Sequence, residues 1–455
     1  MAPQTFAIAV KRLQLAQRGL LNLPGSTPES KARTERLLLQ DFGQHHCFFN
    51  ERGFHNHLSH HLLAIYDLGA PTSRIQVAYD AEAPHQRPIV LPGAERHEIT
   101  QENWTNRLEE PTAYPDYLNF FSKRVSEVGP RSLLEQYIFA PQANGNGALM
   151  LVRFVSGLVH PLIQTGYGVE FGLDYMVAMG LSQTAAHGTT TADVYADHSS
   201  VPEINFSEEP SPSISQLFEE IYSSPILAPL LPYDPDALDS QRRQAFLRDP
   251  ARVKELKRIL NKWTFYRNSS DIDDKLKQCL VQSTLLLAAT GLRDKRPGVR
   301  PRQDFFLMHL LTSSLFLRPL VLLLSDPIHK AQLLHAYLRV IALTTLLRGR
   351  PVIDVKALYD YPFDENSNVW PTVVENAIQH SDEHVPKVVR SLYHGAQLYG
   401  TEENVGVPGV DGVVFSRAAK ILFDRLGWVS KGEKEGNWDH SALGWDEAWS
   451  SANKE

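Results

Sequence analysis

Histidines are the residues of this sequence whose type and spacing suggest chemistry. They are densest in residues 53–63, which read GFHNHLSHHLL and contain His55, His57, His60 and His61. Six of the 18 histidines fall between His45 and His61. Because neutral imidazole is the commonest metal ligand among side chains, the cluster suggests a metal site. The alternative is a solvated polar helix edge, which is the more frequent meaning of the adjacent pair His60 and His61.

Further histidines lie inside apolar runs that have helical periodicity. They are His160, His187, His309, His335 and His384. A buried imidazole needs a hydrogen-bond partner, so a satisfied core histidine explains any single one of them. Several recur on helices that must pack together, however. A helical protein that turns several neutral imidazoles inward can bind Fe, Zn, Cu or Ni.

Helical spacing brings some of these side chains to one face. His57 and His61 are four residues apart, so both can face the same way. The more specific metal pattern HExxH is missing from the sequence, as are the nucleotide loops GxGxxG and GxxxxGK[ST] and the hydrolase elbow GxSxG. The histidines therefore carry the chemical argument.

A second pair lies near a helix start at residues 381–387. His384 and Lys387 are three residues apart and can point at a common centre, while Ser381 and Pro386 indicate the helix start. The two acids beside this pair, Asp382 and Glu383, are expected to point elsewhere if Lys387 points inward.

The elements that position these residues have the pattern of helices. Apolar residues recur at three and four positions in runs such as HLLAIYDLG, MLVRFVSGLVHPLI, LKQCLVQSTLLLAATGL and VVRSLYHGAQLYG. Alternation of period two does not appear over comparable lengths. We therefore predict an all-α protein with a single large multi-helix domain, residues 41–430, and a metal site buried between helices. An N-terminal segment, 1–40, precedes this domain.

A polar C-terminal arm, 431–455, follows the helical domain. In this arm Trp445 and Trp449 are four residues apart, as on one helix face. The arm is expected to pack against the rest of the chain.

Composition and charge indicate which classes of partner and which compartment are possible. Hydrophobic residues make up 43% of the chain and charged residues 21%, which is typical of a protein with a large core. The net charge of −7 argues against a nucleic-acid partner, since phosphate binding needs clustered Lys and Arg. Two cysteines, Cys47 and Cys279, exclude a disulfide framework and indicate a reducing compartment. We expect a cytoplasmic protein.

Two segments raise other possibilities for location. The first 28 residues contain Lys11, Arg12 and Arg18 but no acid, which is the charge pattern of an organellar transit peptide; an ordinary amphipathic element is the alternative. Residues 305–324 form an apolar run long enough to span a bilayer. Because Arg318 inside the run would be costly in lipid, we expect a buried core helix and no membrane partner.

Five motifs together resemble the questin oxidase-like family of fungal polyketide pathways. They read GFHNHLSHHLLAIYDLGA, YLNFF, MLVRFVSGLVHPLIQTGYGVEF, FFLMHLLTSSLFLRPL and SDEHVPKVVRSL, and the likeness runs from about residue 40 to residue 400. The family is associated with oxidative opening of anthraquinone rings. One member type is a Baeyer–Villiger oxygenase, and another is a non-heme iron dioxygenase whose iron is held by four histidines and a carboxylated lysine.

The resemblance implies metal ligands residue by residue. The His-Asn-His element matches residues 55–57, with His57 as the ligand, and the other matching ligands are His160, His309 (followed by Thr312), His384 and Lys387. The same five residues are our catalytic candidates. The implied cofactors are Fe(2+), a CO2-derived carbamate on Lys387, and O2 as co-substrate. A neutral, buried lysine amine can add CO2, and the resulting anion would balance the charge of iron among neutral imidazoles.

We accordingly predict an iron-dependent dioxygenase that opens a ring of an anthraquinone-type aromatic polyketide. One alternative is a Baeyer–Villiger oxygenase that uses an external reductant. The other is a non-enzymatic polyketide carrier whose histidines are structural. The partner is a small aromatic polyketide in each case, and the candidate pocket residues are Phe54, His61, Tyr167, Phe171, His187, Phe305 and Tyr393.

Overall fold

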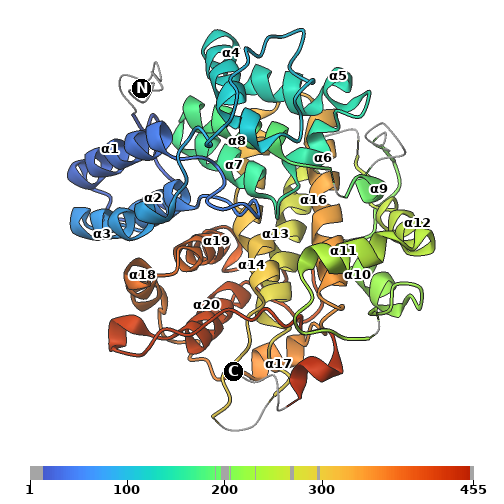
Figure 1. Cartoon of the computed structure of the whole chain (residues 1–455). Helices are drawn as coiled ribbons and strands as arrows, with labels where there is room; N and C mark the ends of the chain where they lie inside the picture. The colour runs from blue at the N-terminus through green and yellow to red at the C-terminus, as the bar shows by residue number, and fades with distance from the viewer. Residues whose placement is uncertain are drawn as a thin grey trace. The chain divides into compact units, whose positions relative to one another are not determined.

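The computed structural model describes residues 14–450 except 190, 196–203, 205, 231, 267–270 and 295–297. Within these residues the regular structure is helical, and β-pairing is limited to isolated bridges such as that between Phe48 and His55 (Figure 1). The all-α prediction is confirmed. Lys11 and Arg12, on which the transit-peptide alternative depends, lie outside the described residues.

Packing divides the chain into two compact units, Met1–Thr189 with Ala377–Arg390, and Thr190–Asn376 with Ser391–Glu455. The first unit contains α1(Pro28–Gln44), α2(Leu58–Asp67), α3(Thr72–Glu82), α4(Tyr114–Leu134), α5(Pro141–Asn144), α6(Met150–Phe154), α7(His160–Phe171) and α8(Asp174–Ala186). The second contains α9(Ala192–Tyr195), α10(Ile214–Ser223), α11(Asp239–Leu247), α12(Pro250–Leu260), α13(Ile272–Ala288), α14(Phe305–Ser314), α15(Leu317–Leu323), α16(Pro327–Leu347), α17(Val355–Asp360) and α20(Val414–Leu426). Two helices, α18(Trp370–Gln379) and α19(His384–Tyr399), have residues in both units.

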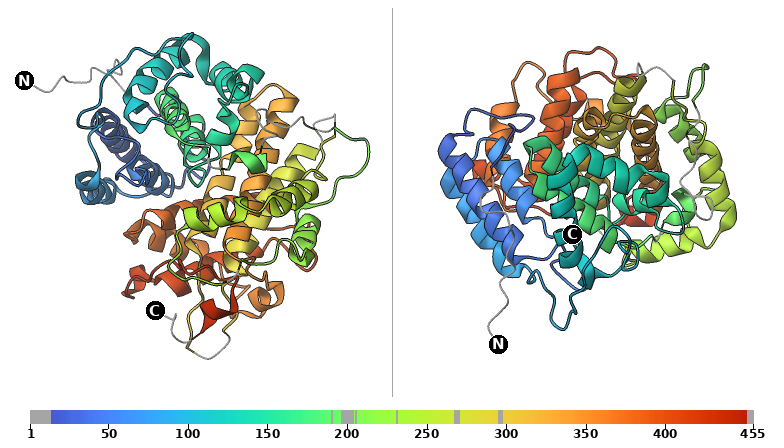
Figure 2. Two further views of the ribbon diagram at one scale, coloured as in Figure 1. Left: turned by 45° about the vertical axis from the view of Figure 1, so that its right-hand side comes forward. Right: turned by 90° about the horizontal axis from the view of Figure 1, so that it is seen from above.

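Two groups of helices build the first unit. The helices α1, α2 and α3 pack on one another, and α8 packs against both α4 and α7 (Figure 1 and Figure 2). The start of α1 is fixed by Thr27, whose hydroxyl accepts a hydrogen bond from the Ser30 backbone N–H, followed by Pro28 in the first turn. Because α1 spans residue 40, the chain is helical on both sides of the expected segment boundary.

The run MLVRFVSGLVHPLI contains a break that its periodicity does not reveal. The run forms α6 and α7, and between them Gly157, Leu158 and Val159 have φ of 56°, 52° and 60°. Left-handed backbone is unfavourable for Leu and for β-branched Val. A Cβ on Gly157 would lie 2.4 Å from the His187 ring, so glycine is required there. The turn redirects the chain so that α7 begins at His160.

A buried ion network ties three elements of the first unit together. Arg390 of α19 donates from Nε to Asp67 Oδ2 at 2.9 Å, and its NH2 group pairs with Glu170 of α7. The three side chains are at most 1% exposed. Asp67 is the last residue of α2. Burial and the neighbouring Asp67 raise the pKa of Glu170 to about 7, although Arg390 opposes the shift.

The apolar run at 305–324 lies in the second unit as two helices, α14 and α15. The stretch Phe305–Leu323 is long and apolar enough to cross a membrane, but most of it is buried inside the protein. The start of α14 is capped by Asp304, which accepts from the Phe306 and Leu307 backbone N–H groups at 2.8 and 3.1 Å and also pairs with buried Arg348. In this unit α14 packs against α13 and α16.

The C-terminal arm is packed through its tryptophans, as expected, but without the predicted helix face. Trp438 and Trp445 are 7% and 6% exposed. Trp445 has extended backbone, and Asp446–Trp449 form a 3-10 turn, so Trp445 and Trp449 do not share an α-helix. Their indole N–H groups donate to the carbonyls of Leu230 and Leu443.

We predict that Arg390→Ala destabilises the protein by about 3–5 kcal/mol, because it leaves two buried carboxylates without their cation. The measurement is the free energy of unfolding from a urea titration. Arg258→Ala is the control: Arg258 pairs with Glu220 and Glu255 but is 49% exposed, so its loss should cost at most about 1 kcal/mol. Equal small losses in both variants would contradict the role given to the buried network.

Candidate metal site

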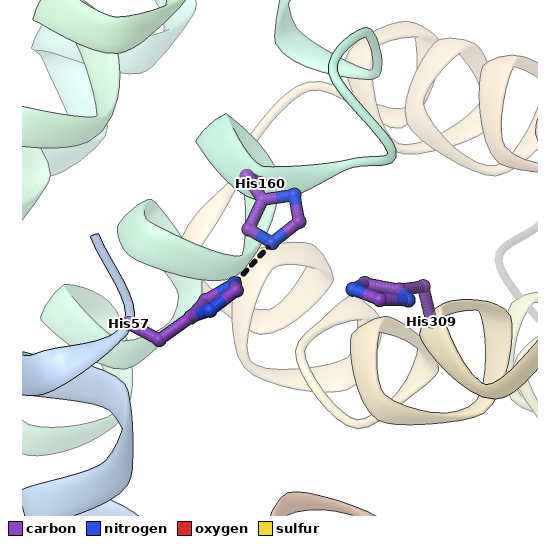
Figure 3. A group of neighbouring side chains, drawn as sticks. All are labelled: His57, His160 and His309. Carbon is purple, nitrogen blue, oxygen red and sulfur yellow. Dashed lines mark hydrogen bonds between the residues drawn. The ribbon is translucent and has the colours of Figure 1, made fainter. Parts of the chain in front are cut away.

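Two predicted ligands of the first unit lie at helix starts. His57 is the residue immediately before α2, and His160 is the first residue of α7. The Nε2 atoms of the two rings face each other at 2.6 Å (Figure 3). The structure therefore brings together two residues that are 103 positions apart in the sequence.

The other ring nitrogens determine what this contact can be. His160 Nδ1 lies 2.7 Å from the Gly157 carbonyl oxygen, which can only accept, so Nδ1 carries the proton. His57 Nδ1 lies 3.1 Å from Glu383 Oε1 and donates to that carboxylate in the same way. In the neutral rings each Nε2 atom then carries a lone pair, and the two lone pairs face each other. Only an additional proton or a metal cation between them relieves the repulsion.

The proton is the weaker of these two explanations at His57. Burial, assisted by the positive charge of Lys387, lowers the pKa of His57 well below its usual value. A cation that accepts lone pairs from both rings fits the observed donor set, because neutral imidazole is a strong ligand for first-row metals.

His384 brings a third imidazole to this region. It is the first residue of α19 and donates from Nδ1 to Asp382 Oδ1 at 3.0 Å, which turns its Nε2 into an acceptor. Its ring lies 4.8 Å from that of His57. His57, His384 and Glu383 each offer one ligand atom, and these atoms lie within 4.8 Å of one another.

The expectation that Asp382 and Glu383 turn away was wrong. The helix begins at His384, so both acids lie in the preceding turn, where helical spacing does not apply. Asp382 accepts from His384 and Glu383 from His57. Burial raises the pKa of Asp382, but hydrogen bonds from the His384 side chain and backbone outweigh it and hold the pKa below its usual value.

Lys387 is buried, as its predicted role requires. Its side chain is in the first turn of α19 and the residue is 5% exposed. Burial lowers its pKa, against the opposing effect of Glu383, Asp382 and Glu82. A lower pKa increases the fraction of neutral amine, which is the form that can react with CO2 or bind a cation.

His309 lies in the second unit, on α14 (Figure 3). It is 2% exposed and donates from Nδ1 to the Phe305 carbonyl at 2.9 Å, so its Nε2 is an acceptor as in the other three predicted histidines. Thr312 follows one turn later and donates to the His309 carbonyl at 3.3 Å.

The solvated-edge alternative for His60 and His61 is wrong, because each is 1% exposed. His60 donates from Nε2 to Gln164 Oε1 at 2.8 Å and stacks on Tyr167. Burial, with a contribution from Lys387, lowers the pKa of His60 to about 3. His61 Nδ1 contacts Glu82, and its Nε2 has no hydrogen-bond partner.

The predicted pocket residues are in varied surroundings. Tyr167 and Phe171 are buried against the Arg390 guanidinium at 5.3 and 5.8 Å, whereas Phe54 is 53% exposed. In the second unit, Phe305 contacts the His309 ring at 4.8 Å and Tyr393 stacks on Trp370 at 4.4 Å. Their role as pocket residues stays a prediction.

A second imidazole pair escaped the sequence analysis. His55 Nε2 and His187 Nε2 are 2.6 Å apart, and the His55 ring lies parallel to that of His160 at 4.0 Å. His187 itself was expected only as a pocket residue. The alternation His-Asn-His was a usable signal for His55, since residues two apart in extended chain point to the same side.

Comparison with known proteins shows which family and which relatives the chain resembles. The family model described as questin oxidase-like matches residues 54–392, which include all five predicted ligands. The questin oxidase of Aspergillus terreus is 27% identical over 432 residues, 91% of each chain. The Baeyer-Villiger oxidase AgnL3 of Paecilomyces divaricatus is 27% identical over 405 residues, 84% of this chain and 82% of its own. Oxidoreductase AflY of Aspergillus parasiticus is 26% identical over 416 residues, which are 89% of this chain and 82% of its own.

We predict that His160→Ala reduces bound metal to about a tenth of the wild-type content or less, because the cation loses one of two facing lone pairs. Metal content is measured on purified protein by elemental analysis, with circular dichroism to verify the fold. His335→Ala is the matched control: this histidine is also buried, but it contacts Arg339 in the second unit. Retention of wild-type metal by His160→Ala would remove it from the ligand set.

Proposed function

The chain belongs to the questin oxidase-like family, and from this premise we propose that it is an oxidoreductase that adds oxygen to an anthraquinone-type aromatic polyketide. The observation that carries the proposal is the pair of opposed Nε2 lone pairs of His57 and His160, 2.6 Å apart in a buried site. The relatives named as questin oxidase and Baeyer-Villiger oxidase support a Baeyer–Villiger reaction. We place the activity in polyketide metabolism in the cytoplasm.

We assign the metal as Fe(2+), with His57, His160 and His384 of the first unit as ligands. That His309 is the fourth ligand rests on the family resemblance alone. When bound, iron would supply the capacity to bind and reduce O2. The protein residues contribute fixed ring orientations, since all four Nδ1 atoms donate to an oxygen of the protein. Such partners hold the ligand tautomer and raise the basicity of the ring.

Lys387 is the proposed fifth ligand, as a carbamate. The neutral amine would add CO2 with loss of one proton, and the N–C bond formed would give an anionic carboxylate on a long arm. Its burial and its lowered pKa support this role. The anion would compensate part of the charge of the metal, which four neutral imidazoles leave unbalanced.

The proposed reaction inserts one atom of O2 between a carbonyl carbon and the adjacent ring carbon of the substrate. The second atom leaves as water. Two electrons and one proton come from an external hydride donor such as a reduced nicotinamide, and the second proton comes from solvent. The ring thereby becomes a lactone that hydrolysis can open.

A dioxygenase that cleaves the ring is the second candidate, and the buried Lys387 favours it. A carboxylated lysine is the feature of the iron dioxygenase type within the family that the motifs resemble. In that reaction both atoms of O2 enter the product and the reduced ring supplies the electrons, so an external reductant is unnecessary.

We predict that turnover of a hydroxyanthraquinone under ¹⁸O₂ with NADPH places one labelled atom in the product and one in water. Mass spectrometry of the product gives the count. Two labelled atoms in the product of the same compound or of its reduced anthraquinol, without NADPH, would establish the dioxygenase instead. Tight anthraquinone binding by a metal-free protein that forms no product would establish the carrier and end the enzyme proposal.

For the carbamate, we predict that Lys387→Ala loses more than about 90% of activity and recovers part of it in millimolar acetate, because a small carboxylate can occupy the place of the carbamate. Lys387→Arg should be inactive, since guanidinium stays cationic. The matched control is Lys275→Arg, a change at the other buried lysine, 3% exposed in the second unit, which should keep its activity. Full activity of Lys387→Arg would contradict the carbamate.

A further inference from the structure

Two adjacent acids, Asp382 and Glu383, contact two different proposed ligands. Asp382 Oδ1 accepts from His384 Nδ1 at 3.0 Å. Glu383 Oε1 accepts from His57 Nδ1 at 3.1 Å and lies 3.6 Å from His384 Nδ1. His57 and Glu383 are 326 positions apart, so this contact depends on the fold. One short turn thus reaches two imidazoles that come from different helices.

The turn is held in place independently of the two proposed ligand rings, His57 and His384. Asp382 Oδ1 also accepts from the His384 backbone N–H at 2.8 Å, and the Asp382 N–H donates to His380 Nδ1 at 3.2 Å. Arg74 of α3 donates to the carbonyls of Ile378 and His380 at 2.7 and 2.8 Å. The two carboxylates are therefore presented by a fixed backbone, which is what a residue that orients a ligand needs.

We propose that Asp382 and Glu383 are positioning residues of the metal site, which fix the tautomers of His384 and His57 and strengthen both as donors. The inference rests on the proposed function, since it assumes that these rings bind the metal. A carboxylate that accepts from Nδ1 prevents the proton from moving to Nε2, where it would block coordination.

Their charge has a second effect on the same site. Two carboxylates that accept from Nδ1 of two neutral imidazoles place negative charge near the cation. This charge favours the higher oxidation state of a bound metal and raises its affinity. His160 and His309 differ in this respect, because their Nδ1 atoms donate to uncharged backbone carbonyls. The proposed ligand set thus has two carboxylate-backed rings and two carbonyl-backed rings.

The test compares Glu383→Gln and Asp382→Asn with the wild type in metal affinity. Both variants should bind Co(2+), the probe used, about 10–100-fold more weakly, and the visible absorption spectrum of the bound Co(2+) should shift. The matched control is Glu82→Gln. Glu82 also contacts a histidine Nδ1, that of His61, and adds negative charge near Lys387, but His61 is outside the ligand set. Its affinity should stay within about 2-fold of the wild type.

A double-mutant cycle identifies the ring through which Glu383 acts. If Glu383 acts through His57, then Glu383→Gln should change the Co(2+) affinity of His57→Ala by less than about 2-fold. Unchanged affinity and spectrum in both acid variants, or an equal loss in Glu82→Gln, would overturn the inference while leaving a metal-binding wild type intact. A wild-type protein that binds neither Co(2+) nor Fe(2+) would instead overturn the proposed function.

Discussion

The salt bridge of Arg390 with Asp67 and Glu170 is the interaction on which the site of the first unit depends. Each partner belongs to a helix that begins at a proposed ligand: α2 after His57, α7 at His160 and α19 at His384. Asp67 and Glu170 lie ten residues beyond their histidines, or about 15 Å along the helix axis. Movement of one helix along its axis would therefore break a buried ion pair and displace a ligand at the other end.

Burial makes this network costly to form and costly to break. The network can therefore constrain how the three helices are arranged. Two carboxyl groups share one guanidinium in the core, and backbone N–H groups add further hydrogen bonds to them. The Leu20 N–H donates to Glu170 Oε1 at 2.8 Å, and the Asn22 N–H to Asp67 Oδ1 at 2.7 Å. Such a network contributes less to net stability than to fixing one arrangement, because desolvation offsets much of the attraction. At the other end of α2, burial of His57 lowers the pKa of its ring.

The sequence predicted what periodicity and residue type can encode. Apolar spacing identified the helices, and apolar surroundings identified His160 and His309 as buried. Periodicity failed at Gly157–Val159, where apolar residues continue through a left-handed turn. It also failed at Asp382 and Glu383, because helical spacing was applied to residues that precede the helix. Long-range pairs such as His57 with Glu383 depend on which helices pack together, and no local pattern encodes that.

Two other buried histidines, His60 and His46, have hydrogen bonds that differ from those of the proposed ligands. His60 donates from Nε2 to Gln164, and His46 contacts the Pro111 carbonyl through Nε2 while its Nδ1 accepts from the Phe48 N–H. These rings use Nε2 for a hydrogen bond within the protein, as a core histidine with satisfied hydrogen bonds does. The four proposed ligands instead donate from Nδ1, two to backbone carbonyls and two to carboxylates. His61, whose Nδ1 contacts Glu82, shares this tautomer, so the tautomer permits coordination through the Nε2 lone pair but does not require it. What favours a metal is that His57 Nε2 and His160 Nε2 face each other at 2.6 Å.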